Sequence, residues 1–525
     1  MRLNVLPLMD AIEVYIRKSN DDLEQTLADE GYTAPAEAVA AINRIEDSVA
    51  AVYDEQIGEL LKQIEDATGV ENFADEVWPE IRDEADLRNA LRDIFCSEFT
   101  DLLGTFTTNW MLDAAPDLAV DNRITKPSLQ FVKDWSEELA NLMQLSSNEQ
   151  IENILEEAVS SHLSVQEVSQ LISDSGIRAA GYQSRRTAIT EVLRTESYSQ
   201  LEYMRQDPTV EKKGWFHTGA HKNEPRPNHV AMSGQQVPVE EPFELTGRDG
   251  ARYYPMCPRD TCLPASESIN CHCIMKSVRN KSVLGMSAEE RREMRQKYMD
   301  EVDAEWEEKM AVEAENKIDW PEKGEKISTT QFKEVMKYAR EKGVRLSGFK
   351  QFDGNIQTVK ELVDDVDAIA ADFPLIKEGK KPVTILLDES IDSNDFAVTR
   401  NHVICINANA FRDTGKLAEE YQKLVDGGWF VKGTDYRSII RHETGHVIAN
   451  KYGLDGLETV KTVAGVTSND AAICVARKEL SEYAAFYSDG TEIISEVFSG
   501  AYSSGEKNKF ALQVIESFGI IQERE

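Results

Sequence analysis

Two histidines four residues apart enclose a glutamate in the sequence His442-Glu443-Thr444-Gly445-His446. Residues at positions i and i+4 of an α-helix lie on one face, so both imidazoles can bind the same metal ion. Glu443 is then left free to act as a general base. This spacing predicts metal-assisted hydrolysis, with zinc as the expected metal because imidazole is a preferred zinc ligand.

The flanking residues predict the helix that would position this pair. Apolar residues form a stripe on both sides of the histidines: Ile439, Ile440, Val447 and Ile448. Thr434 or Asp435 is expected to cap the start of the helix, and Gly453 lies where a left-handed C-terminal stop is expected. The alternative interpretation is a surface helix with two solvated histidines.

A catalytic zinc site also needs a third protein ligand and an open position for water. Glu492 and Glu496 are four apart on a second expected helix and therefore share a face. Glu492 is the candidate third ligand. Glu496 is the candidate acceptor for the second N–H of a ligating histidine, which such imidazoles usually donate. The alternative is a pair of solvated carboxylates.

The order of these elements is similar to that in a known peptidase family. His-Glu-x-Gly-His is followed by a Ser-x-Tyr-Ala segment containing Tyr483, and then by Glu492-x-x-x-Glu496. This pattern resembles the metallopeptidase domain of anthrax lethal factor and its relatives. The resemblance implies a zincin-like α+β domain in which Glu492 binds zinc and Tyr483 assists at the oxyanion, with Tyr487 as the substitute tyrosine.

Composition narrows the classes of partner. The chain has 525 residues, and 94 acidic against 58 basic residues give a net charge of -36. Such a charge works against coating nucleic acid or an anionic membrane, so neither direct sequence-specific nucleic-acid binding nor membrane binding is expected. No apolar run approaches bilayer length, and Met1 to Lys18 lacks the pattern of a signal peptide. A soluble protein made in a cytoplasm is expected.

Length and patterning predict a multidomain α+β protein. The expected order is a helical N-terminal region at 1–126, a small α+β domain at 127–280, a charged helical linker at 281–326 and the zincin-like domain at 327–525. Within the last region, Val383 to Leu387 and Val403 to Asn407 are expected strands. The second of these is the candidate edge strand for holding an extended peptide substrate.

Residues 127–280 contain four spaced elements in a recognisable order. They are Arg194-Thr-Glu196 on a helix, Lys213-x-Trp215 on a strand, Arg226-x-x-His229, and a closing Asn270-Cys-His-Cys273. This combination resembles the Mu F-like minor head proteins of tailed phages. The resemblance implies a virion protein inside the head at or near the portal, in contact with the portal and other head proteins, and assembled in the host cytoplasm.

Cys257, Cys262, Cys271 and Cys273 cluster in the same region. Thiolates suit zinc, and histidines lie nearby in the sequence at positions His217, His221, His229 and His272, so a structural zinc site is one interpretation. Reduced packing cysteines are the other.

Together these patterns predict a phage minor head protein carrying a zinc endopeptidase that acts on a peptide or protein substrate. Two alternatives stay open: a purely structural head protein with an inactive zincin-like domain, and a peptidase ejected with the DNA to act on a host protein.

Overall fold

The computed structural model describes residues 22–82, 86–175, 182–218, 225–248, 250–280, 285–315, 317–379, 381–487 and 490–518. The predictions for Met1 to Lys18 and for His221 fall outside these ranges. Contacts divide the chain into two compact units. Unit 1 comprises residues 1–73 and 84–312, and unit 2 comprises residues 74–83 and 313–525.

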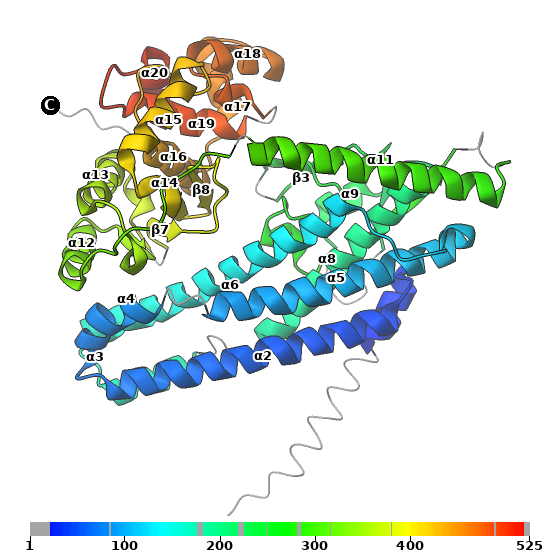
Figure 1. Ribbon diagram of the computed structural model, residues 1–525, viewed down its shortest axis with the longest axis horizontal. Coiled ribbons are helices and arrows are strands. Elements are labelled where there is room, and N and C mark those ends of the chain that lie inside the picture. Colours follow the sequence, from blue (N-terminus) through cyan, green and yellow to red (C-terminus); the bar gives the residue numbers. More distant parts are fainter. Residues whose placement is uncertain are drawn as a thin grey trace, which may run out of the picture. The chain divides into compact units, whose positions relative to one another are not determined.

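Unit 1 is built on long helices that run side by side (Figure 1). Its helices are α2 (Pro35–Asp66), α3 (Val70–Asn72), α5 (Asp86–Ala114), η2 (Pro116–Leu118), α6 (Lys126–Ser160), α7 (Val165–Asp174), α8 (Tyr182–Gln206), α9 (Pro227–Met232), α10 (Ala265–Ser268) and α11 (Ala288–Glu315). Because apolar residues recur at helical spacing along α2 and α5, both helices bury one face against α8. The helical prediction for the N-terminal region is confirmed.

A small antiparallel sheet completes unit 1. Its strand order is β2-β1-β5, with β1 at Val210–His217, β2 at Gln236–Pro238 and β5 at Cys273–Arg279. A separate ribbon pairs β3 (Leu245–Thr246) with β4 (Arg252–Tyr253). Trp215 on β1 is buried, and its ring meets the Phe243 ring edge to face in the core below the sheet.

The predicted boundary at residues 126/127 falls inside unit 1. One apolar core contains Phe95 and Phe99 of α5 together with Ala188 and Val192 of α8 and Ile274 of β5. The N-terminal helices therefore supply core surface to the α+β region instead of forming a separate domain. A helix buried by its own neighbours and a helix buried by a later segment have the same apolar periodicity, so the pattern alone did not distinguish them.

The expected linker at 281–326 is also corrected. It does contain a long charged helix, α11, but α11 is docked on unit 1 through buried groups. Arg295 is buried and donates hydrogen bonds to Gln206 Oε1 at 2.9 Å and to Asp121 Oδ1 at 2.7 Å. Met299 is buried beside it in the same helix. The charged helix α11 therefore has a buried face, in which the charge of Arg295 is paired with Asp121.

Unit 2 is an α+β unit with one sheet. Its helices are η1 (Phe73–Val77, of which Phe73 belongs to unit 1), α4 (Trp78–Ile81), α12 (Thr329–Glu341), η4 (Phe349–Gln351), α13 (Ile356–Asp372), η5 (Pro374–Ile376), α14 (Ala408–Phe411), α15 (Thr414–Asp426), α16 (Ser438–Tyr452), α17 (Gly456–Ala464), α18 (Asn469–Glu479), η6 (Tyr483–Ala485), α19 (Thr491–Ala501) and α20 (Lys509–Ser517). Its strands are β6 (Arg345–Ser347), β7 (Thr384–Asp388), β8 (Ala397–Arg400) and β9 (Val403–Asn407). The sheet order is β6-β7-β9-β8.

The two predicted strands are present as β7 and β9, but the predicted edge is wrong. All five residues of β9 are buried, because β9 pairs in parallel with β7 on one side and antiparallel with β8 on the other. The edge strands are β6 and, next to β9, β8, a strand of four residues that is too short to stand out by alternation of apolar and polar residues.

No described helix has both the length and the apolar character needed to span a bilayer.

Unit 1 has a buried carboxyl group whose titration makes a testable prediction. Glu196 is buried, and none of the described residues donates a hydrogen bond of normal geometry to either of its oxygens. Burial raises the pKa of Glu196 to about 8, against the opposing attraction of Arg259. A raised carboxyl pKa contributes stability below the unfolded pKa that is lost as pH rises towards 8.

We therefore expect the Glu196→Gln substitution to remove a pH-dependent loss of stability. Between pH 5 and pH 8 the free energy of unfolding of unit 1 should fall less in this variant than in the wild type, by a few kcal/mol at about 1.4 kcal/mol per pKa unit. Denaturant unfolding at both pH values measures the difference. Equal pH dependence in the two proteins would contradict the assignment.

Candidate metal centre

Helix α16 presents the two histidines as predicted, and it ends as predicted. Gly453 follows its last turn with φ +64, the left-handed stop inferred from the sequence. The predicted capping of its start is not found. The N-cap is Arg437, whose side chain makes no capping hydrogen bond. The two predicted caps take part in the turn before the helix: the Thr434 hydroxyl donates to Val431 O, and Asp435 Oδ1 accepts from the Arg437 amide.

Three predicted ligands converge in unit 2. Glu492 Oε2 lies 3.1 Å from His442 Nε2 and 3.2 Å from His446 Nε2. One ligand atom from each side chain lies within 4.8 Å of the other two. Ligand atoms of a tetrahedral zinc with bonds of about 2.0–2.1 Å are about 3.3 Å apart, so this set of nitrogen and oxygen donors fits zinc. The His446 side chain keeps 20% exposure, which leaves the group open towards solvent.

Glu496 lies behind the ligands, as predicted. Its Oε1 is 2.9 Å from His442 Nδ1, so the imidazole is oriented with Nε2 towards Glu492. Ser481 donates a hydrogen bond of 2.6 Å to Glu496 Oε2 and accepts one from the Ala484 amide. This role of Ser481 was not predicted. The signal available in the sequence was its place as the first residue of the Ser-x-Tyr-Ala segment.

The charges within the group compensate one another. Burial would raise the pKa of Glu492, but hydrogen bonds from His442 and His446 hold it well below its usual range. Burial would lower the pKa of His442, but Glu492 and Glu496 raise it. Without a metal, a protonated imidazole supplies the positive charge that the buried carboxylate needs, and a divalent metal ion held by the same three side chains would supply it instead.

Glu443 is positioned from the edge strand. The Thr399 hydroxyl of β8 lies 2.7 Å from Glu443 Oε2 and 3.1 Å from Glu443 O. This contact ties the proposed base to the strand on which a peptide substrate would pair. Thr399 was not among the predicted site residues, because the pattern of apolar and polar residues does not reveal β8.

Tyr483 lies over His442, one of the three candidate ligands. Its ring is stacked on the His442 ring, with centroids 5.6 Å apart. Burial raises the pKa of Tyr483 above its usual value, so the phenol keeps its proton at neutral pH. The substitute Tyr487 is 48% exposed and packs on Phe486. Glu482, the residue before Tyr483, pairs with Arg477 at 3.0 Å instead of joining the group of candidate ligands.

The position of Glu492 depends on how closely α16 approaches α19. A Cβ atom at Gly445 would lie 2.7 Å from Ser495 Cα and 3.2 Å from Phe498 Cβ, so only glycine permits this separation. Gly445 is the fourth residue of His-Glu-Thr-Gly-His. The motif therefore encodes the helix contact as well as the ligands.

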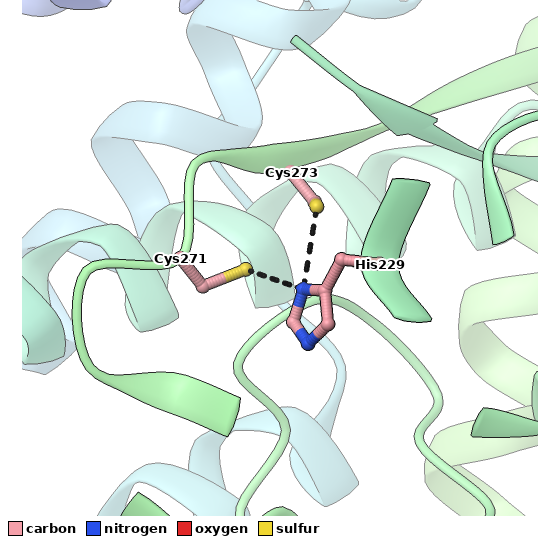
Figure 2. A group of neighbouring side chains, drawn as sticks. All are labelled: His229, Cys271 and Cys273. Atoms are coloured by element: carbon pink, nitrogen blue, oxygen red, sulfur yellow. Dashed lines mark hydrogen bonds between the residues drawn. The ribbon is translucent and has the colours of Figure 1, made fainter. Parts of the chain in front are cut away.

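The predicted metal site of four cysteines in unit 1 is not assembled. Cys257 is fully buried in the apolar core, where burial raises its pKa well above the usual range, and Cys262 is exposed. Cys271 and Cys273 do meet, together with His229 (Figure 2). The four cysteines were predicted to meet because they are close in the sequence. In the structure only Cys271 and Cys273 lie together, and their neighbour is His229 of α9.

Comparison with known proteins places part of unit 1 in a family. Residues 149–276 match the family described as Phage Mu protein F like protein. The chain is 35% identical over 176 residues to the uncharacterized protein YqbB of Bacillus subtilis (strain 168). That alignment covers 34% of this chain and 56% of the relative, so the chain spans little more than half of that protein. No solved structure matches the chain.

The chain thus carries a Phage Mu F-like domain at residues 149–276. The matched residues include the helix α8, the sheet strands β1 and β2, and the cluster of His229, Cys271 and Cys273. Unit 2 lies outside the matched residues.

Gly445 gives a direct test of the helix contact. The Gly445→Ala substitution should destabilise unit 2 by about 1–3 kcal/mol, the usual cost of overpacking, and should weaken zinc binding because α19 must move away. Denaturant unfolding and competition with a chelator measure the two effects.

Gly58→Ala on α2 is the matched control. Gly58 lies in a helix and a Cβ atom there meets nothing within 4 Å, so alanine should stabilise by about 0.5–1 kcal/mol. If Gly445→Ala behaved like this control, α16 and α19 would not be in the contact described.

Proposed function

We propose that this chain is a phage minor head protein whose unit 2 is a zinc-dependent endopeptidase. The observation that carries the peptidase proposal is the convergence of His442, His446 and Glu492, with Glu443 held beside them by the edge strand. The Mu F-like domain supports placement in the virion, inside the head near the portal and in contact with other head proteins. The anionic charge of the chain is consistent with protein partners instead of direct nucleic-acid binding.

The residues of the site divide the chemistry of peptide hydrolysis among them. A zinc ion held by His442, His446 and Glu492 would supply Lewis-acid activation of water and of the scissile carbonyl. Glu443 accepts the proton of the attacking water and returns it to the leaving amine. Thr399 holds Glu443 Oε2 in place for both transfers. Tyr483 donates a hydrogen bond to the oxyanion, a type of contact typically worth about 3 kcal/mol of barrier.

The edge strand supplies the surface for a peptide substrate. β8 is the last strand of its sheet and lies against α16, so an extended peptide paired with β8 would run beside the ligands. Main-chain pairing recognises an extended peptide with little regard to its side chains. Exposed Phe486 and Tyr487 next to Tyr483 would add apolar contacts, which favours a substrate with bulky apolar side chains near the cleaved bond.

The base is tested by Glu443→Gln, which keeps the three ligands. We expect zinc content to be unchanged and cleavage to be lost, measured by metal analysis, by hydrolysis of fluorescent casein and by proteome-wide mapping of cleavage sites. Glu482→Gln is the matched control because Glu482 is a nearby exposed carboxylate paired with Arg477. It should cleave like the wild type.

The outcomes separate the alternatives. Cleavage that persists in Glu443→Gln would overturn the assigned base. A wild-type chain that binds zinc but cleaves nothing would favour a structural head protein with an inactive unit 2. Cleavage sites found in host proteins of infected cells, and absent from purified proheads, would favour an ejected peptidase.

Thr399→Val tests the positioning of the base. Removing the hydroxyl leaves Glu443 without its contact to β8, so kcat should fall about 10-fold or more while zinc content stays the same. If KM rose and kcat did not change, Thr399 would contact the substrate instead of positioning the base.

A further inference from the structure

Unit 1 contains a second group of side chains suited to a metal ion. His229 Nδ1 lies 3.5 Å from Cys271 Sγ and 3.6 Å from Cys273 Sγ, and all three residues are buried. Figure 2 shows both sulfur atoms pointing to the same ring nitrogen. A tetrahedral zinc with bonds of about 2.3 Å to sulfur and 2.0–2.1 Å to nitrogen separates these donors by about 3.5–3.6 Å. The donor spacing fits that geometry.

The other nitrogen of His229 has the partner that a ligating imidazole requires. His229 Nε2 lies 2.9 Å from Glu267 Oε2, and Glu267 is fully buried. Asn228 Nδ2 and the Arg248 amide donate to the same carboxylate and fix it. With its proton on Nε2, His229 directs the lone pair of Nδ1 at the two sulfurs. A carboxylate behind a histidine is the common outer partner at protein zinc sites.

A fourth donor stands beside the three. His217 pairs with Cys273 in the register of β1 and β5, and its Nδ1 lies 3.6 Å from Cys273 Sγ. Its Nε2 is buried and has no hydrogen-bond partner among the described residues. Rotation of this imidazole towards the three other donors would complete a Cys₂His₂ set, which is a closed structural arrangement with no position for water.

We propose that unit 1 binds a structural zinc ion through His229, Cys271 and Cys273, with His217 as the fourth ligand. The ligands come from the end of β1, from α9 and from the turn that begins β5, so one ion would join three segments of the Mu F-like domain. Arg259 donates to the Cys271 carbonyl and holds the same turn from the core side. The site is independent of the proposed peptidase centre.

The test uses the full chain carrying His446→Ala, so that metal bound in unit 1 is measured alone. We expect about one zinc per chain, and we expect it to be lost when Cys271→Ser and Cys273→Ser are added. Cys257→Ser or Cys262→Ser in the same background are matched controls that should keep the zinc. Replacement by cobalt should give sulfur-to-metal charge-transfer absorption that disappears with the Cys271 and Cys273 substitutions only.

Glu267→Gln provides a second variant in case loss of the cysteines prevents folding. It keeps every ligand, and removal of an outer carboxylate should weaken zinc binding about 10-fold to 100-fold in a chelator competition. The proposal is overturned if the folded His446→Ala chain contains no zinc, if the zinc survives both cysteine substitutions, or if Cys271 and Cys273 are found joined as a disulfide. Unchanged zinc affinity in Glu267→Gln would overturn the role given to that carboxylate.

Discussion

The close contact between α16 and α19 is the constraint on which the candidate centre depends. Two histidines one turn apart provide only two ligands. The third, Glu492, is on a different helix and lies 46 residues after His446 in the sequence. Gly445 lets the helices approach until Ser495 and Phe498 occupy the space of its missing side chain. At that separation the carboxylate of Glu492 reaches both imidazoles. Packing and chemistry are therefore set by the same five-residue segment.

The same physical rule governs the polar groups buried in both units. A buried charge is tolerated only when partners compensate it, and in each unit one imidazole of the group has a carboxylate behind it. Glu496 and Ser481 orient His442 in unit 2, and Glu267 orients His229 in unit 1. Such networks hold the candidate donor atoms together without a metal ion, which would reduce the cost of ordering them if a metal binds.

The sequence predicted what short-range spacing determines. The i, i+4 pairs located the histidines of α16 and the glutamates of α19, and the resemblance to lethal factor placed Glu492 and Tyr483 beside them. It failed where long-range packing decides. The edge strand β8 is too short for a visible pattern. In unit 1, helices before residue 126 share an apolar core with later segments. Cys257 also packs in an apolar core of unit 1 instead of joining a metal site. The role of Thr399 could not be inferred without the strand that carries it.

Anomalous diffraction at the zinc absorption edge, from crystals of the full chain, tests the central claim most directly. We expect a zinc peak in unit 2 bonded to His442 Nε2, His446 Nε2 and one oxygen of Glu492, with Glu496 hydrogen-bonded to His442 and not to the metal. Absence of a peak at this position, or a peak bonded to Glu496 or Glu482 with Glu492 turned away, would contradict it.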